Sequence, residues 1–180
     1  MSPLQEGPVG PFPEGADPDE YDRLRRRVMW KMPTGLFVIG SRAGDRRNLM
    51  TANLVVQVSH DPKLVAVSVE KDAVTNALIK EGGVFVVNVI DREDRAIVRK
   101  FTKPVEHDGE QSLNGFAVHD GRTGAPILDQ ALAFVECELR HSVDLGSHTL
   151  FIGEVVDAGF QKPEETEVLR MEDTRMNYGG

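Results

Sequence analysis

The 180-residue sequence contains a single cysteine, Cys137, so no disulfide can form within one chain. Such sparing use of cysteine is typical of reducing compartments, and we expect a cytoplasmic protein. No apolar run reaches the roughly 18 residues that a membrane span needs. The first residues also lack the basic and apolar segments of a secretory leader. Neither a membrane association nor export is predicted.

Several functional motifs are missing too. Aromatic residues make up only 6% of the sequence, so aliphatic side chains must fill the core of the one domain that this length suggests. No GxGxxG turn follows a strand, and there is no nucleophile elbow or motif of paired carboxylates. With one cysteine and scattered histidines (His60, His107, His119, His141), no metal site is predicted. Hydrolysis and a doubly wound dinucleotide-binding fold are therefore not expected.

The net charge of −8 is unevenly distributed along the chain. Residues 1–22 carry six acidic residues and no Lys or Arg, which leaves the remainder close to neutral and gives no support for a nucleic-acid partner. Residues 1–20 also hold five of the ten prolines, a composition that buries too little apolar surface to offset the entropy of ordering. We predict a disordered acidic arm at 1–20, a domain at 21–160 and a tail at 161–180.

Four arginines follow this arm: Arg23, Arg25, Arg26 and Arg27. Such a cluster on a helix could bind phosphate. More often it is a solvated face or pairs with local acids, and we favour that interpretation.

Hydrophobic spacing predicts a chain made mostly of strands. Alternating or continuous apolar stretches predict strands at residues 35–41, 49–59, 63–70, 84–90, 132–143 and 149–158. Helical spacing predicts helices at 21–32 and 92–101, and a short one that begins near Val74 and ends at Gly82 and Gly83. Residues 102–125 are expected to form a long loop. Few helices and tight connections favour a mainly β fold, an antiparallel barrel with peripheral helices.

Polar residues follow one face of the segment after residue 46. Thr51, Asn53, Gln57 and Ser59 are spaced to share a strand face opposite apolar neighbours. The helix that follows begins at Asp72–Thr75, where free backbone N–H groups can hold an anion. Together these features predict a phosphate-bearing ligand along a sheet. Alternatively, the strand face meets solvent and the helix start is an ordinary one capped by Asp72 or Thr75.

Four sequence stretches within residues 28–158 resemble the flavin-reductase-like family with the FMN-binding split barrel. They are MPTGLFVIGS, NLMTANLVVQVSHDPKLVAVSVEK, GGVFVVNVI and GSHTLFIGEVVDAG. The resemblance implies a six-stranded antiparallel Greek-key split barrel and a homodimer with one flavin per subunit near the interface. The flavin is expected to be FMN, with FAD as the alternative, and NADH or NADPH the electron donor.

The implied activity is hydride transfer from the nicotinamide to flavin N5, with reduced flavin passed to a monooxygenase or another redox protein. Two alternatives stay open. One is a flavin carrier or electron-transfer protein of the flavoredoxin kind, and the other is a cofactor-free dimeric barrel.

The resemblance also implies positions for the cofactor. One segment is expected to run along the ring and ribityl chain, with its backbone bonding the polar edge of the ring: Asn48, Leu49, Met50, Thr51, Ala52, Asn53 and Leu54. The neighbouring strand and the following helix are expected to meet the ribityl chain and the phosphate, through Ser68, Val69, Glu70, Lys71, Val74 and Thr75, with Lys100 in reach of the phosphate.

His148, in the GSHT turn, is the implied catalytic residue near flavin and nicotinamide, although a histidine in a hairpin turn is often simply exposed. Tyr178 is a further candidate for contact with the flavin or the second subunit. Cys137 reads as a small buried hydrophobic residue.

Overall fold

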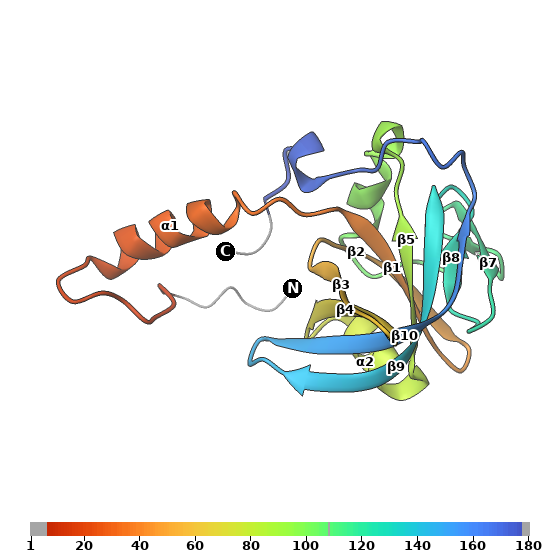
Figure 1. Ribbon diagram of the computed structural model, residues 1–180, viewed down its shortest axis with the longest axis horizontal. Helices are drawn as coiled ribbons and strands as arrows, with labels where there is room; N and C mark the ends of the chain where they lie inside the picture. Colours follow the sequence, from red (N-terminus) through yellow and green to blue (C-terminus); the bar gives the residue numbers. More distant parts are fainter. Residues whose placement is uncertain (1–6, 108, 178–180) are drawn as a thin grey trace.

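The computed structural model describes residues 7–107 and 109–177 (Figure 1). The N-terminal half contains α1 (Pro18–Met29), β1 (Phe37–Ala43), β2 (Arg46–Ala52), β3 (Val55–His60), β4 (Lys63–Glu70), α2 (Val74–Gly82) and β5 (Val84–Val89). Two short 3-10 helices follow, η1 (Arg92–Asp94) and η2 (Ile97–Phe101). The remainder contains β6 (Ser112–Leu113), β7 (Phe116–Asp120), β8 (Pro126–Leu128), β9 (Ala133–Asp144), β10 (His148–Phe160) and η3 (Met171–Asp173).

The main sheet of the described chain is antiparallel, with strand order β2-β1-β5-β9-β10-β4-β3. Its two edge strands, β2 and β3, are consecutive in the chain and are separated only by residues 53 and 54. A two-residue link can join opposite edges only if the sheet curls until those edges meet, so the sheet forms a split barrel. The mainly β class is thereby confirmed.

The strand count differs from the expected six. The main sheet has seven strands, because the strand expected at 49–59 is broken at Asn53 and Leu54, and β6, β7 and β8 form a separate three-stranded sheet. Counting β2 and β3 as one bent strand restores six around the barrel.

Two apolar clusters fill the protein. Inside the barrel, side chains such as Ile39, Val67, Phe85 and Phe151 are fully buried. Cys137 belongs to this cluster and is 0% exposed, as the alternation of its strand predicts. Burial, aided by the neighbouring carboxylate of Glu136, raises the pKa of its thiol to about 12.

A second cluster lies between the barrel wall and the segments that cover it. It includes Leu49 and Phe101, together with Leu169 from the C-terminal tail. The tail therefore forms part of the core rather than trailing from the domain.

Two expectations about residues 92–125 are wrong. The helix expected at 92–101 is the pair of 3-10 helices, because the Asp91 carboxylate accepts the Glu93 N–H and the Arg92 N–H is taken by the Glu167 carbonyl of the tail. The loop expected at 102–125 contains the hairpin β6–β7. Its turn is Asn114-Gly115, with both residues at positive φ (53° and 78°), the pair most typical of tight hairpins.

Helix α1 projects away from the barrel (Figure 1). It begins within the expected arm, where the Asp17 side chain accepts the Glu20 N–H as an N-cap. Two arginines of the cluster pair locally, since both Arg25 and Arg26 contact Asp22. The division into an arm, a domain and a tail stays a prediction.

Candidate flavin site

A pocket of about 320 Å³ opens where the barrel is split. Its walls come from the end of β2, the end of β4, the start of α2, the segment after η2, and the tail. The lining residues are Leu36, Asn48, Met50, Thr51, Ala52, Asn53, Leu54, Ser68, Val69, Glu70, Asp72, Ala73, Val74, Phe101, Thr102, Lys103, Pro104, Met171 and Met176. The structure thus brings together ten of the fourteen residues expected to bind the cofactor.

Asn48 holds three walls of this pocket together. Its side chain is 4% exposed, and its Nδ2 donates to the Thr75 hydroxyl at 2.9 Å. Its Oδ1 accepts the Val105 N–H at 3.2 Å. Because both ends of the amide are bonded to protein, Asn48 fixes β2, α2 and the 102–105 segment relative to one another.

Asn53 differs from Asn48 in having an unpaired acceptor. It lies in the β2–β3 link, is 7% exposed and lines the pocket, and its buried Oδ1 has no partner among the described residues. A buried acceptor without a partner costs about 1–3 kcal/mol. A ligand that offers an N–H group to this oxygen would remove the penalty.

Thr51 is not simply solvent-facing. Its hydroxyl donates to the Val98 carbonyl at 2.5 Å and so attaches β2 to η2. Gln57, by contrast, lies on the exposed part of β3 and bonds the Ser59 carbonyl of its own strand. The polar face expected along residues 51–59 is therefore divided by the break in the strand, and only its first part reaches the pocket.

The start of α2, at Ala73 and Val74, lines the pocket. Its N-cap is Ala73, whose side chain makes no cap hydrogen bond. Val74 lines the pocket, whereas the Thr75 side chain is fully buried with its hydroxyl on Asn48. Any contact of Thr75 with an anion would have to use its backbone N–H.

Three charged residues line the pocket: Lys103, Glu70 and Asp72. Lys71, expected at the phosphate, instead bonds Asp144 at 2.7 Å. That hydrogen bond, with a second from the Gly146 N–H, holds the pKa of Asp144 below its ordinary value.

Three more expected residues lie off the pocket lining. Leu49 is fully buried in the second apolar cluster, and the Lys100 carbonyl accepts a hydrogen bond from Asn114. His148 pairs with Glu70 across β10 and β4, one strand away from the pocket wall. Its Nδ1 is 2.9 Å from the Ser147 hydroxyl, and its buried Nε2 has no partner in the described chain.

Sequence reasoning named Tyr178 in the tail but missed Met171 and Met176. Residues near 170 pair with two distant segments: Leu169 N–H donates to the Ile90 carbonyl, and Met171 N–H donates to the Thr34 carbonyl. This pairing brings Met171 and Met176 to the pocket. No local motif marks the tail, although two methionines in a polar tail are a weak signal of packing. Tyr178 lies outside the described residues.

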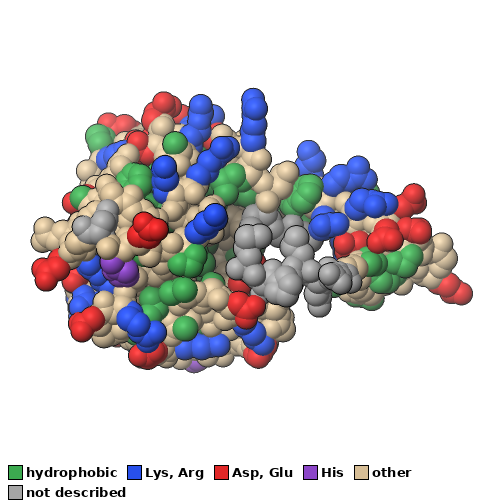
Figure 2. Space-filling view, turned by 180° about the vertical axis from the view of Figure 1, so that it is seen from behind, with side chains coloured by type: hydrophobic (Ala, Val, Ile, Leu, Met, Phe, Trp, Pro, Cys, Tyr) green, Lys and Arg blue, Asp and Glu red, His purple; other side chains and the backbone are tan. Residues whose placement is uncertain are grey.

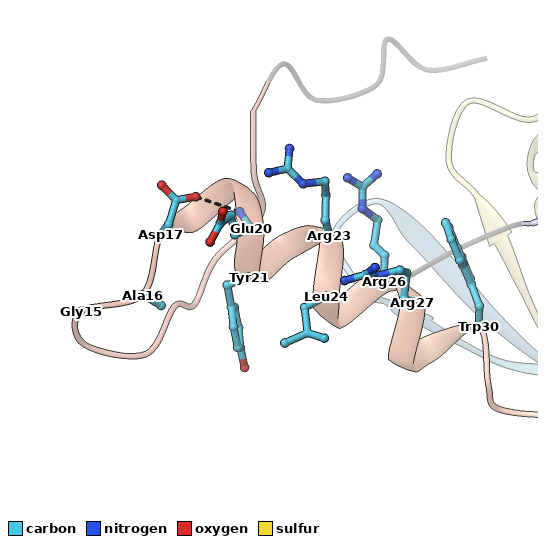
Figure 3. A pocket seen from close by; sticks show the side chains of 10 residues that line it. All are labelled: Gly15, Ala16, Asp17, Glu20, Tyr21, Arg23, Leu24, Arg26, Arg27 and Trp30. Carbon is cyan, nitrogen blue, oxygen red and sulfur yellow. Dashed lines mark hydrogen bonds between the residues drawn. The ribbon is translucent and has the colours of Figure 1, made fainter.

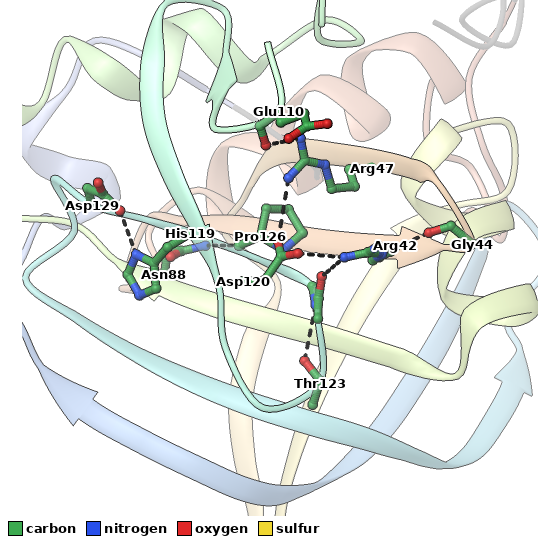
Figure 4. A network of polar contacts seen from close by, with 12 residues as sticks. Arg42, Gly44, Arg47, Asn88, Glu110, His119, Asp120, Thr123, Pro126 and Asp129 are labelled. Atoms are coloured by element: carbon green, nitrogen blue, oxygen red, sulfur yellow. Dashed lines mark hydrogen bonds and ion pairs between the residues drawn. The ribbon is translucent and has the colours of Figure 1, made fainter.

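A polar network at the other end of β2 has a structural role (Figure 4). Arg42 and Arg47 both contact Asp120, and Arg42 also donates to the Gly124 carbonyl. These bonds attach the β1–β2 hairpin to the small sheet. Among the described residues there is no cluster of His, Cys, Asp or Glu that could hold a metal ion. Nor does that part of the chain contain a helix with the length and apolarity to cross a bilayer.

Comparison with known proteins identifies the family. Residues 29–180 match the model of the flavin reductase like domain. The chain belongs to the flavin reductase like family. The pocket lies inside the matched region.

Solved structures of flavin reductase like proteins share the fold. The NADH:FAD oxidoreductase of Streptomyces globisporus superposes with a TM-score of 0.72 at 31% identity, covering 90% of this chain and 89% of that one. In sequence, the ferric-chelate reductase (NAD(P)H) of Archaeoglobus fulgidus is 33% identical over 85% of this chain and 90% of its own length.

Other flavin reductase like relatives are longer. The high molecular weight rubredoxin of Moorella thermoacetica is 38% identical over 73% of this chain, which spans 58% of that protein. A diflavin flavoprotein of Nostoc is 28% identical, and the chain spans a quarter of it. The domain therefore also occurs as one part of larger proteins.

Proposed function

We propose that this protein is an NAD(P)H-dependent flavin reductase, with the pocket at the split of the barrel as its flavin site. The observation that carries the proposal is the joint presence, in one pocket, of the β2–β3 link, the end of β4 and the start of α2. These are the segments that the family resemblance assigns to flavin.

The pocket residues suit a flavin. Met50 and Leu54 offer apolar surface to a flat ring, and the unpaired Oδ1 of Asn53 suits a ring N–H. The N-terminus of α2 and Lys103 supply the positive end for a phosphate. A bound flavin would supply the hydride chemistry itself, so the protein need only bind, orient and shield it.

The chain's own residues account for those three tasks. Asn53 would accept a hydrogen bond from the polar edge of the ring. Asn48 and Thr51 hold the pocket walls together through hydrogen bonds with Thr75, Val105 and Val98. Met171 and Met176 cover the pocket from the tail side and exclude water. His148 remains our candidate for contact with the nicotinamide, since its Nε2 is unpaired beside the strand that forms the wall.

The relatives support flavin and nicotinamide as ligands but do not distinguish FMN from FAD. One is an NADH-dependent FAD reductase of Streptomyces globisporus at 33% identity, and another an NADH-dependent FMN reductase of Streptomyces nodosus at 34%. A styrene monooxygenase flavin reductase of Pseudomonas putida shares the fold with a TM-score of 0.65 at 28% identity. Delivery of reduced flavin to a monooxygenase is the corresponding role for this chain, and the cytoplasm the expected location.

We also infer a homodimer. The outward side of β3 exposes Val56 and Val58, at 60% and 50%, and Leu54 of the adjoining link is 39% exposed. β3 is the last strand in the sheet order, and an exposed apolar face of this kind is usually covered in soluble proteins. Leu54 also lines the pocket, so a second copy placed there would border the flavin site.

The test is to supply the purified protein with FMN or FAD and to follow the oxidation of NADH and of NADPH. We expect turnover that depends on both flavin and nicotinamide. Reduction of a tightly held flavin without turnover would favour the electron carrier, and failure to bind either flavin would overturn the site.

A matched pair of charge variants tests the pocket itself. Lys103→Met should raise the Kd for flavin severalfold, and Asp72→Asn should lower it, because the two side chains bear opposite charges at the same opening. Equal effects of the same sign would exclude a phosphate at this position.

A further inference from the structure

Helix α1 exposes an apolar stripe. Leu24 and Val28 are 48% and 58% exposed, and Met32 just beyond the helix is 61% exposed. Tyr21 and Leu24 point to one side of the helix and Arg23 to the other (Figure 3). A helix of 12 residues is marginal by itself in water and depends on packing of its apolar face.

The preceding segment is attached to α1. Arg25 donates to the carbonyls of Val9 and Pro11, and the rings of Phe12 and Tyr21 meet edge to face at 6.5 Å. In the part of the chain that the structure describes, the hydrogen bonds and ion pairs of α1 stay within residues 9–31. These contacts hold residues 9–12 against α1.

The same chain carries a second uncovered apolar stripe, the β3 face formed by Leu54, Val56 and Val58. In Figure 1, α1 and β3 lie apart, and the space-filling view from behind shows Lys and Arg side chains gathered on the α1 projection (Figure 2). The helix consequently does not cover the β3 face of its own chain.

We propose that α1 packs on the β3 face of a second copy of this chain, a contact that rests on the homodimer proposed above. Every copy carries one helix stripe and one strand stripe. A two-fold axis pairs each helix with the other copy's strand, so all four stripes are buried without a third component.

The size of the helix sets what this contact can do. Twelve residues span about 18 Å and a helix is about 10 Å wide, so each α1 covers on the order of 200 Å². A stable interface buries about 800 Å² per partner. The helices therefore reinforce a dimer whose remaining contacts come from the barrels, and each helix borders the other copy's pocket at Leu54.

Cysteine cross-linking tests the pairing directly. The only native cysteine, Cys137, is fully buried with its pKa raised to about 12, so introduced cysteines report alone. A mixture of Val28→Cys and Val56→Cys chains of different mass should form a mixed disulfide under mild oxidation. The control is a mixture of Val28→Cys and Phe160→Cys chains. Phe160 is 59% exposed at the end of β10, and this mixture should form no mixed disulfide.

The double variant Val28→Cys/Val56→Cys distinguishes packing of α1 on the second copy from packing of α1 on its own barrel. A disulfide within one chain, formed at high dilution, would overturn the proposal. Absence of the mixed disulfide in a protein that still runs as a dimer would also overturn the proposal. That outcome would leave the proposed flavin site and homodimer unaffected.

Trp30, the sole tryptophan, offers a second readout at the end of α1. Its emission should shift to longer wavelength on dilution, in parallel with the loss of dimer mass. Leu24→Glu should raise the dimer dissociation constant about tenfold and remove the shift, while flavin still binds. Identical Trp30 emission in monomer and dimer would overturn the helix contact alone, and a monomer at every concentration would overturn the dimer as well.

Discussion

At the scale of single residues, the pocket combines side chains that the protein has already satisfied with one that it has not. Asn48 uses both ends of its amide on Thr75 and Val105, whereas the Oδ1 of Asn53 is buried and unpaired. The first residue holds the structure, and the second is available to a ligand. Two asparagines five positions apart therefore have different roles.

Asn53→Leu separates these roles by experiment. The substitution nearly preserves volume and removes the unpaired acceptor, so the flavin-free protein should be about 1 kcal/mol more stable in urea. Flavin affinity should fall by roughly tenfold, because a ring N–H loses its acceptor. Thermal unfolding with and without flavin measures both effects. A loss of stability in the flavin-free state would show that Asn53 is structural.

Cys137 yields a prediction about alkaline pH. Its pKa is raised from an ordinary 9.0 to about 12 by burial, so the unfolded chain releases this proton at lower pH than the folded chain. The free energy of unfolding is therefore unaffected by this thiol below pH 9 and should fall progressively between pH 9 and 12. Iodoacetamide at pH 8 should leave the native thiol unmodified by mass spectrometry and alkylate it in urea. Rapid labelling of the native protein would contradict the burial.

The family resemblance of residues 48–71 located most of the pocket, and strand alternation with an Asp-Pro turn marked β2 to β4 locally. It could not show that Thr75 and Lys71 are already engaged, by Asn48 and Asp144, since those partners lie 27 and 73 positions away. It also selected Lys100 where the pocket presents Lys103. A turn of 3-10 helix replaces the expected α-helix there, and this changes which lysine faces the opening.

At the scale of elements, the C-terminal tail is fixed where it leaves β10. Lys162 contacts Asp91 at 2.9 Å and Asp94 at 2.6 Å, next to η1. Burial would lower the pKa of Lys162, but the hydrogen bonds to the two carboxylates outweigh it and leave the pKa raised. This cluster guides the tail toward residues 34 and 90, a pairing of segments too distant in sequence for any local pattern to predict.

Lys162→Met should destabilise the protein by about 1 kcal/mol near neutral pH, since it leaves Asp91 and Asp94 without their shared cation. The pKa of Asp91 is lowered, first by the Glu93 N–H and then by Lys162. The ionised Asp91 therefore stabilises the fold above about pH 3.8, the ordinary pKa of an aspartate, and this stabilisation is lost as the pH falls below that value. The difference between variant and parent should therefore shrink below about pH 4 in urea titrations. Arg170→Met, at a 63% exposed pair, is the control and should cost little.

At the scale of the whole molecule, two apolar faces are left uncovered, on α1 and on β3. Neither could be recognised from the sequence, because an alternating strand reads the same whether its apolar side faces the core or a second subunit. The family resemblance predicted a homodimer, and the exposed β3 face is where we propose its interface.

Val56→Asp should convert the dimer to monomer at micromolar concentration, because it buries a carboxylate without a partner in the interface. Light scattering after size exclusion measures the mass. Val168→Asp, at a site 44% exposed in the C-terminal tail, should leave the mass unchanged. A dimer that tolerates Val56→Asp would place the interface elsewhere.

The pairing of the tail with residues 34 and 90 has a consequence for protein engineering. Because Met176 lines the pocket, a redox protein fused after Asn177 starts beside the opening of the proposed flavin site. A short linker would then hold the two redox centres at high effective concentration. A fusion before α1 would start at the far end of a projecting helix, where the same linker gives no such proximity.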